Sequence, residues 1–286
     1  MLKNSKKIII FSIISILLVM LIFWIVWENS ALEVNSYCVK SKSLPKEFCD
    51  FRIAQVSDLH NVEMGKNNEK LISTLKQCKP DIIVITGDLI DSRRMNLKIA
   101  LKFVEQAIEI APCYYVAGNH EARMSEYSEL KKALYDYGVN VLENSKVQIE
   151  RKGKTITILG VNDPSFKTNY LFGDDISVMN TFLDGLLLEQ DGYTILLSHR
   201  PELFEVYANK NIDLVFSGHA HGGQFIIPFI GGVFAPNQGL FPKYYAGVHT
   251  KFNTTMVVSR GIGNSIIPFR VNNRPEVILV QLSAEN

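Results

Sequence analysis

Five short segments of this chain carry side chains that bind divalent metals. Carboxylate, imidazole and amide ligands in one set suit borderline first-row metals better than calcium or a closed cysteine-ligated zinc. Taken singly, an Asp-x-His or Gly-Asp pair is a weak signal, and an ordinary turn is the commoner explanation. Five of the six histidines fall in these segments, which favours one shared metal site. The segments are Asp58-Leu-His60, Gly87-Asp88-Leu-Ile-Asp91, Gly118-Asn119-His120-Glu121, His199 in Leu-Ser-His-Arg-Pro, and Gly218-His219-Ala-His221.

Each segment follows a short apolar run that is typical of a buried strand. The runs, at 53–56, 82–85, 114–117, 194–197 and 214–216, are rich in β-branched and aromatic residues and too short for helices. Ligand sites of open α/β sheets lie beyond the carboxyl ends of the strands, so we expect these five ends to converge. Asp58 and His60 are two residues apart, as are His219 and His221, and each pair should project the same way.

The order and residue types of these segments resemble the calcineurin-like metallophosphoesterase family, over most of the chain after residue 50. The resemblance implies a two-metal phosphoester hydrolase, either a phosphodiesterase or a pyrophosphatase, that takes manganese, iron or zinc. Three stretches are most similar to a membrane-anchored bacterial branch of the family: Ser57-Asp58-Leu59-His60, His219-Ala-His221-Gly-Gly-Gln224 and Ser259-Arg260-Gly261-Ile-Gly263.

The resemblance also implies a role for each residue of the site. Two ions would lower the pKa of a shared water and clamp the phosphoryl oxygens, so that hydroxide attacks phosphorus in line. His120 would be catalytic, either stabilising the transition state or protonating the leaving oxygen. The implied ligands are Asp58, His60 and His221 on one ion, Asn119, His199 and His219 on the other, and Asp88 as the bridge.

Two acidic residues beside these ligands have two interpretations each. Asp91 either hydrogen-bonds a ligand or opens the helix that follows it. Glu121 either orients the His120 imidazole or is an acidic residue at a helix start.

Three arginines are candidates for binding the substrate phosphate, because a guanidinium offers bidentate geometry. Arg260 is the strongest of them, because it lies in the Ser-Arg-Gly-Ile-Gly loop. Arg200 and Arg270 are weaker candidates, and the plain alternative for all three is a solvated arginine. His249 fits no motif and is expected on the surface or in a loop.

Residues 8–27 form an uncharged apolar run that is long enough to cross a hydrocarbon core as a helix. Lys3, Lys6 and Lys7 precede the run, and acidic residues follow it, so the positive-inside rule places the amino terminus in the cytoplasm. An uncleaved anchor is favoured over a cleaved signal peptide, because the run is long and no small-residue cleavage site follows it. We expect a single-pass cell-membrane protein with an extracytoplasmic catalytic domain: a tail at 1–7, the anchor at 8–27, a linker at 28–50 and the domain at 51–286.

Helix-like stretches near 66–78, 94–110, 125–137 and 174–189 alternate with the strand-like runs, as in βαβ units. Shorter strands are expected at 147–150, 155–159, 255–258 and 277–281. This order predicts an α/β domain with two packed sheets, and the resemblance implies a four-layer αββα sandwich. Cys38 and Cys49 lie in the expected linker, where they are either disulfide-bonded or free.

The net charge of +1, without a basic run beyond the amino-terminal lysines, argues against nucleic acid as a partner. A tethered phosphoesterase suits a lipid-linked or cell-envelope phosphoester, and a lipid-linked nucleotide pyrophosphate is an alternative substrate. The apolar residues of 225–241 either form an acyl-accepting lip or pack as an ordinary loop. A non-catalytic, metal-stabilised envelope-binding protein is a further alternative, and the complete ligand set with His120 argues against it. No feature of the sequence sets the oligomeric state.

Overall fold

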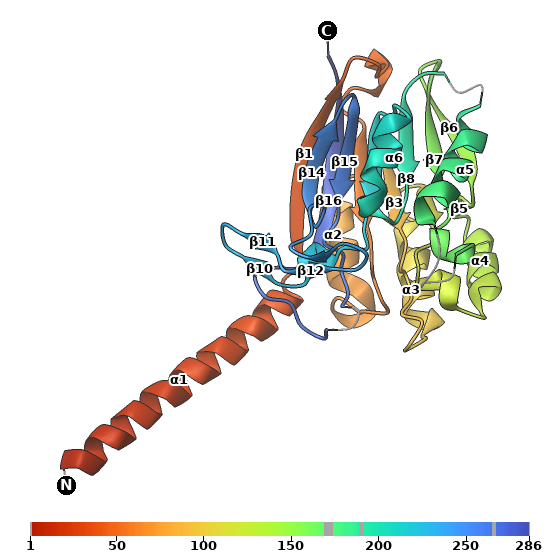
Figure 1. Ribbon diagram of the computed structural model, residues 1–286. Coiled ribbons are helices and arrows are strands. Elements are labelled where there is room, and N and C mark those ends of the chain that lie inside the picture. Colours follow the sequence, from red (N-terminus) through yellow and green to blue (C-terminus); the bar gives the residue numbers. More distant parts are fainter. Residues whose placement is uncertain (1, 169–173, 189–190, 265–266, 286) are drawn as a thin grey trace.

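Two six-stranded sheets pack face to face in the computed structural model, which describes residues 2–168, 174–188, 191–264 and 267–285 (Figure 1). Strands β2, β3 and β4 are parallel to one another, as are β7, β8 and β9. The first sheet has the order β1 (Glu33–Ser41), β16 (Glu276–Ala284), β2 (Arg52–Val56), β3 (Ile82–Thr86), β4 (Cys113–Val116) and β5 (Asn140–Val141). The second has the order β14 (Gly247–Lys251), β15 (Thr254–Val258), β9 (Leu214–Ser217), β8 (Thr194–Leu197), β7 (Lys154–Gly160) and β6 (Ser145–Arg151).

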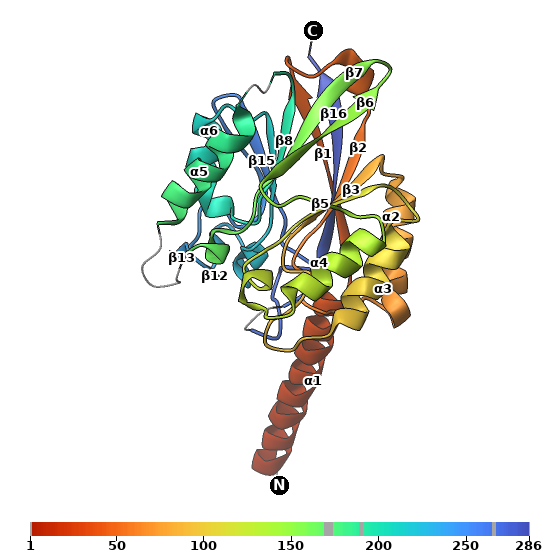
Figure 2. The same cartoon turned by 90° about the vertical axis from the view of Figure 1, so that its right-hand side faces the viewer.

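Helices cover the outer face of each sheet. Figure 2 shows α2 (Glu69–Cys78), α3 (Leu97–Ala107) and α4 (Tyr127–Asp136) on one side, and α5 (Asp175–Leu187) and α6 (Phe204–Asn209) on the other. Successive residues of a strand point to opposite faces, so Ile83 packs under the helices while Val84 packs between the sheets. The predicted four-layer αββα sandwich is confirmed.

The observed elements differ from the predicted ones mainly at helix ends. The five strands that precede the ligand segments have bounds within one residue of those expected. The four predicted helices all begin later, because polar connections and single 3-10 turns precede them; residue 189, at the end of the fourth prediction, lies outside the described residues. Helix α6 was not predicted, since its six residues are too few for a periodic pattern. The 3-10 turns between strands and helices are η2 (Lys66–Asn68), η3 (Glu121–Arg123), η4 (Pro164–Phe166) and η5 (Pro201–Leu203), while η1 (Lys46–Phe48) lies between β1 and β2.

The segment expected to be a linker contains strand β1 instead. It pairs in parallel with β16 along its whole length, from Glu33 opposite Glu276 to Ser41 opposite Ala284. Exposed and less exposed residues alternate along β1, and Val39 is buried between the two sheets. The strand escaped prediction because an edge position requires few apolar residues. All four cysteines are free, so the structure favours thiols at Cys38 and Cys49 over a disulfide.

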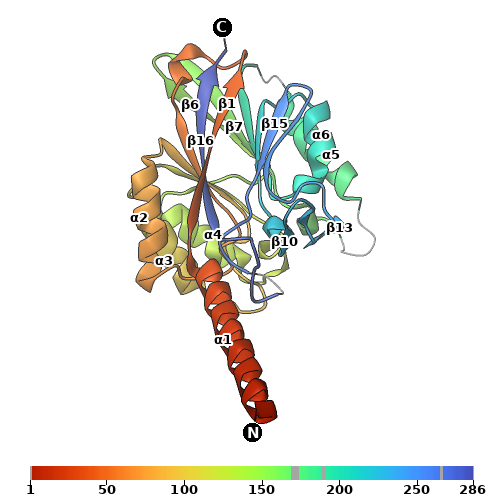
Figure 3. The same ribbon diagram turned by 90° about the vertical axis from the view of Figure 1, so that its left-hand side faces the viewer.

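Helix α1 (Leu2–Ser30) projects from the domain (Figures 1 and 3). Its stretch from Lys6 to Ser30 is apolar enough and long enough to cross a membrane, and none of its most apolar window is buried within the protein. The carboxyl end of the helix is tied to the domain. Asn29 Nδ2 donates to Arg270 O at 3.0 Å, and Arg270 N donates to Asn29 Oδ1 at 2.8 Å. Only two residues separate the end of α1 from the start of β1.

Between β9 and β14 the chain forms two small hairpins that follow the turn η6 (His221–Gly223). The first pairs β10 (Ile226–Ile227) with β11 (Gly231–Gly232), and the second pairs β12 (Phe234–Ala235) with β13 (Gly239–Leu240). Figure 1 shows β10 and β11 at the level where α1 meets the domain. These hairpins contain the apolar segment 225–241 that the sequence singles out.

The position of β1 predicts a difference between two valines on its opposite faces. Val39→Asp should lower the free energy of unfolding by about 3 kcal/mol, because it places an unpaired carboxylate between the sheets. Val34→Asp, on the exposed face of the same strand, should change it by less than about 0.5 kcal/mol. Urea unfolding of the full chain in detergent, followed by circular dichroism, measures both. Equal effects of the two substitutions would contradict the strand assignment.

Candidate metal centre

The ends of five strands bring all seven predicted metal ligands into one buried cluster. The loops that follow β2, β3 and β4 come from the first sheet, and those that follow β8 and β9 come from the second. Each ligand is at most 4% exposed, although every one is polar. The ligands are Asp58 and His60 after β2, Asp88 after β3, Asn119 after β4, His199 after β8, and His219 and His221 after β9.

One half of the cluster contains Asp58, His60 and His221. The Nε2 atoms of His60 and His221 lie 3.2 Å apart. Asp58 Oδ1 is 3.9 Å from the first of these nitrogens and 3.4 Å from the second. Asp88 Oδ2 completes this half, at 3.5 Å from His60 Nε2. Four donor atoms thus surround one point, as a divalent cation requires.

The other half contains His199, His219 and the same carboxylate of Asp88. Asp88 Oδ2 lies 3.2 Å from His199 Nε2, whose partner across the site is His219 Nδ1, also at 3.2 Å. Asn119 lines the same pocket, and its buried Oδ1 has no hydrogen-bond partner among the described residues. Because Asp88 Oδ2 reaches histidines of both halves, its carboxylate is placed to be shared by two ions.

Hydrogen bonds orient the two imidazoles of the second half. His199 Nδ1 donates to Thr86 O at 2.7 Å, which turns its Nε2 toward the cluster. His219 Nε2 donates to Asn237 Oδ1 at 3.0 Å, which leaves the lone pair on Nδ1. Such outer partners commonly orient metal-binding imidazoles.

The charges of the cluster also fit bound cations. Burial lowers the pKa of His60 to about 3 and holds that of His221 well below its ordinary value, so both rings are neutral ligands. Burial acts the same way on His199, yet the carboxylates of Asp88 and Asp58 outweigh it and raise its pKa to about 10. The carboxylates therefore attract positive charge into a dry pocket, and divalent ions supply it without a proton.

The ligand loops adopt backbone conformations that side chains rarely take. Asp58, His60, Asp88, His219 and His221 all have positive φ, between 47° and 64°. Such strain persists only where the surroundings fix it. Here Asp58 N donates to Gly87 O and His60 N donates to Asp88 O, both at 3.0 Å, so neighbouring loops hold each other.

Two glycines allow these loops to approach closely. A Cβ at position 118 would overlap Asp88 Oδ1, and one at position 218 would overlap Ser57 Oγ and Asp58 Oδ2. The first residue of each of these two segments must therefore be glycine, because any side chain there would overlap the neighbouring loop.

His120 lies at the edge of the cluster with its protonation state fixed by Ser92. The backbone N–H of Ser92 donates to His120 Nδ1 at 3.1 Å, so the neutral ring carries its proton on Nε2, which is 4.0 Å from Asp88 Oδ2. Asp91 Oδ1 lies 3.4 Å from the same Nδ1. Asp91 also pairs with Arg93 and Arg94, whereas Asn96 caps α3. Asp91 therefore does not open α3, and the site residue that it contacts is His120 rather than one of the predicted ligands.

The side chain of Glu121 fastens two ligand loops together. Its carboxylate accepts the N–H groups of Asp88 at 2.9 Å, Ile90 at 3.1 Å and Gly118 at 2.8 Å. Burial and the charge of Asp88 raise its pKa to about 7. The sequence suggested a role in orienting His120 or in opening a helix; these contacts show a third role, and α4 begins only at Tyr127.

The three arginines singled out by sequence are held by the protein itself. Arg260 pairs with Glu33 at 2.9 Å and with Glu276 at 2.8 Å, and the structure does not bring it to the pocket of the cluster. Arg200 and Arg270 are fully buried, so the alternative of a solvated arginine is wrong for both. Arg200 forms a bidentate pair with Asp163, and Arg270 donates to backbone carbonyls. His249 lies on the edge strand β14, partly buried against Tyr244, and not in a loop.

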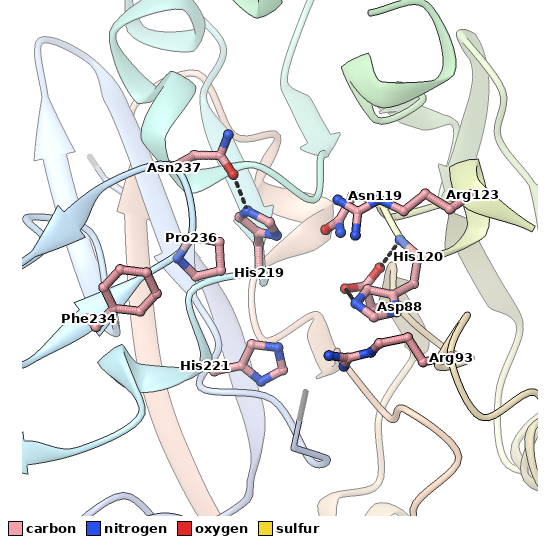
Figure 4. A pocket seen from close by; sticks show the side chains of 10 residues that line it. All are labelled: Asp88, Arg93, Asn119, His120, Arg123, His219, His221, Phe234, Pro236 and Asn237. Carbon is pink, nitrogen blue, oxygen red and sulfur yellow. Dashed lines mark hydrogen bonds and ion pairs between the residues drawn. The ribbon is translucent and has the colours of Figure 1, made fainter. Parts of the chain in front are cut away.

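Two other arginines line the pocket. Figure 4 shows Arg93 and Arg123 reaching in beside Asp88 and Asn119, opposite Phe234, Pro236 and Asn237 of the hairpins. Sequence reasoning missed them, although each lies two or three residues beyond a predicted site residue, Asp91 or His120. That proximity was the available signal.

The three hydrogen bonds of Glu121 generate a prediction. Glu121→Gln turns an amide donor toward backbone donors, and should lower the free energy of unfolding by about 2 kcal/mol and reduce metal content. Glu129→Gln, on the exposed face of α4, is the matched control and should change neither. Metal per chain by plasma mass spectrometry and a urea titration measure both effects. If both variants behave alike, Glu121 does not hold the loops.

Comparison with known proteins agrees with this geometry. The family model described as calcineurin-like phosphoesterase matches residues 51–223. Metallophosphoesterase YkoQ of Bacillus subtilis is 28% identical over 87% of this chain and 90% of its own. Phosphodiesterase YaeI of Escherichia coli is 26% identical over 81% of this chain and 82% of its own. A transmembrane protein with metallophosphoesterase domain from Danio rerio is 28% identical over 84% of this chain, which spans 55% of that protein.

A solved structure shares the fold. The protein TT1561 of Thermus thermophilus matches with a TM-score of 0.51 at 14% identity, over 74% of this chain and 89% of that one. The family match covers all five ligand segments and ends at residue 223, two residues after the last of them. The family match spans more than half of the chain, and the chain therefore belongs to the calcineurin-like phosphoesterase family.

Proposed function

We propose that this chain hydrolyses a phosphodiester or a pyrophosphate at the membrane surface with two divalent cations. Its broader class, a metal-dependent phosphoester hydrolase, follows from the family. The position of Asp88 supports two ions, because its Oδ2 lies 3.5 Å from His60 Nε2 and 3.2 Å from His199 Nε2. Manganese, iron and zinc all suit this mixed nitrogen and oxygen set.

The ligands divide between the two ions according to the two halves of the cluster. When bound, the cations would supply an activated water and neutralise charge on the phosphoryl oxygens. Burial keeps His60, His219 and His221 neutral. Hydrogen bonds to Thr86 and Asn237 orient the rings of His199 and His219. We assign Asp58, His60 and His221 to one ion, Asn119, His199 and His219 to the other, and Asp88 to both.

His120 is proposed to stabilise the leaving oxygen in the transition state by a hydrogen bond from its neutral ring. The Ser92 N–H at Nδ1 places the ring proton on Nε2. That atom lies near Asp88 on the lining of the pocket, where a substrate oxygen would meet it. Asp91 and Ser92 are positioning residues that hold the ring in this orientation.

The walls of the pocket support a substrate with both charged and apolar parts. Arg93 and Arg123 lie on one side, and Phe234 and Pro236 lie on the other (Figure 4). A lipid-linked or cell-envelope phosphoester fits such a pocket, and the relative named phosphodiesterase YaeI supports a diester. Two guanidiniums also suit a second phosphate, which favours a lipid-linked nucleotide pyrophosphate as the second candidate.

Turnover by the full chain in detergent tests the proposal. A chromogenic phosphodiester, the matching monoester and a lipid-linked pyrophosphate should be offered with added manganese, and then with chelator. We expect hydrolysis of the diester or the pyrophosphate, and its loss when the chelator removes the ions that activate water. Turnover that persists in chelator, with metal shown to be absent, would refute the two-ion proposal.

His120→Ala separates this hydrogen bond from the metal site. It should lower kcat about 100-fold or more, as loss of one transition-state hydrogen-bond donor does, while the metal content stays near that of the unchanged protein. His249→Ala is the matched control, because this histidine lies on β14 away from the cluster. An unchanged kcat in His120→Ala would overturn the role given to His120.

We further propose that α1 anchors the protein in the cell membrane, with the amino terminus in the cytoplasm and the catalytic domain outside. The length and exposure of α1 support the anchor, and a relative named as a transmembrane protein supports it as well. The lysines before the apolar run support the orientation.

Protease added to intact cells tests this orientation. The domain should be cut while a cytoplasmic marker protein is spared, because the domain lies on the outer side. Complete protection of the domain in intact cells, and its cleavage after lysis, would reverse the proposed orientation.

A further inference from the structure

We propose that the turn between β10 and β11, residues 227–230, inserts into the bilayer surface beside α1 as a second membrane contact. Phe229 at its tip is fully exposed, and Ile230 and Ile227 are 64% and 40% exposed. These three side chains belong to none of the hydrophobic clusters of the described domain, so their apolar surface faces solvent. This inference depends on α1 as an anchor, and not on the identity of the substrate.

The base of the hairpin packs against the domain, and this packing holds the apolar tip in its exposed position. Gly232 packs against Gly223 and the ring of Tyr245. The ring of Phe225 lies 5.6 Å from that of Phe269, which is itself 42% exposed. Val233 N donates to Phe225 O at 2.9 Å and joins the two hairpins.

A short series of contacts links this hairpin to the end of the anchor. Ile226 N donates to Val271 O at 3.0 Å, and Asn272 Nδ2 donates to Ile226 O at 3.1 Å. The adjacent Arg270 exchanges two hydrogen bonds with Asn29 of α1. The hairpin and the helix end are thus fixed to one another, and Figures 1 and 3 show β10 beside that end.

The composition of the hairpins fits a lipid surface. Residues 222–242 contain no charged side chain, and no acidic residue occurs in 222–250. The apolar run of α1 ends at Trp27, two residues before Asn29. The hydrogen bonds between Asn29 and Arg270 therefore lie where the helix leaves the hydrocarbon. A bilayer is therefore the occupant that the anchor itself brings to this apolar tip.

The same hairpins reach the proposed site. Leu240 and Phe241, at the end of the second hairpin, are 68% and 60% exposed. Phe234 and Pro236 of the same hairpin line the pocket. Apolar side chains therefore occur from the bilayer-facing tip to the metal centre. Under the proposed function, the chain of a lipid-linked substrate would pass along this strip in contact with apolar side chains.

Photocrosslinking of the full chain in vesicles tests the insertion. Phe229 is replaced by the photoreactive p-benzoylphenylalanine, and the protein is reconstituted in phosphatidylethanolamine and phosphatidylglycerol. The control carries the same residue in place of Phe252, an equally aromatic, 67% exposed side chain near Ser41 at the far end of β1 from the anchor. Lipid adducts, weighed by mass spectrometry of the intact chain, should be about tenfold more abundant at position 229. Equal yields at the two positions would overturn the proposal, whatever the activity of the enzyme.

A kinetic measurement tests the route for substrate. Phe229→Ser should leave kcat for a water-soluble diester unchanged, and should lower turnover of a bilayer-embedded phosphoester about tenfold. Phe252→Ser should affect neither. Unchanged turnover of both substrates in Phe229→Ser would overturn the route, and so would an equal loss on both.

Discussion

The structure depends on one carboxylate, that of Asp88, which two groups of buried histidines share. Its Oδ1 accepts the N–H of His120 at 2.8 Å, while Oδ2 faces the nitrogens of both halves of the cluster. Asp88 follows a strand of the first sheet and His199 follows a strand of the second. Their contact therefore links the two sheets at the carboxyl ends of these strands. Without cations, so many polar groups would be costly to bury. The metal ions are therefore expected to stabilise the fold as well as the reaction.

The parts of the molecule that obey simple periodic or positional rules were predictable from the sequence. Buried strands read as apolar runs, and the rule that sites lie beyond parallel strand ends gathered ligands as distant in sequence as Asp58 and His221. Strand β1 escaped because an edge strand carries one buried residue and a polar outer face. Helix α6 escaped because six residues show no period.

The roles of charged residues were harder to predict, because they depend on contacts between remote segments. Arg260 is paired with Glu33 and Glu276, which come from opposite ends of the chain, and no local pattern announces either partner. Glu121 follows His120 directly, but its carboxylate turns back to the amides of two loops. Sequence shows which groups carry charge, and only the fold shows what satisfies them.

The direct passage of α1 into β1 has a consequence for where the enzyme can work. A flexible linker over residues 28–50 would have an end-to-end distance of roughly 25 Å and would let the domain move relative to the anchor. Here the anchor ends at Ser30 and the sheet begins at Glu33, and hydrogen bonds from Asn29 brace the joint. With α1 in a bilayer, the catalytic pocket stays at a constant height and tilt above the leaflet. The enzyme would then meet its substrates by lateral diffusion in two dimensions, and molecules that do not come to the membrane would lie beyond its reach.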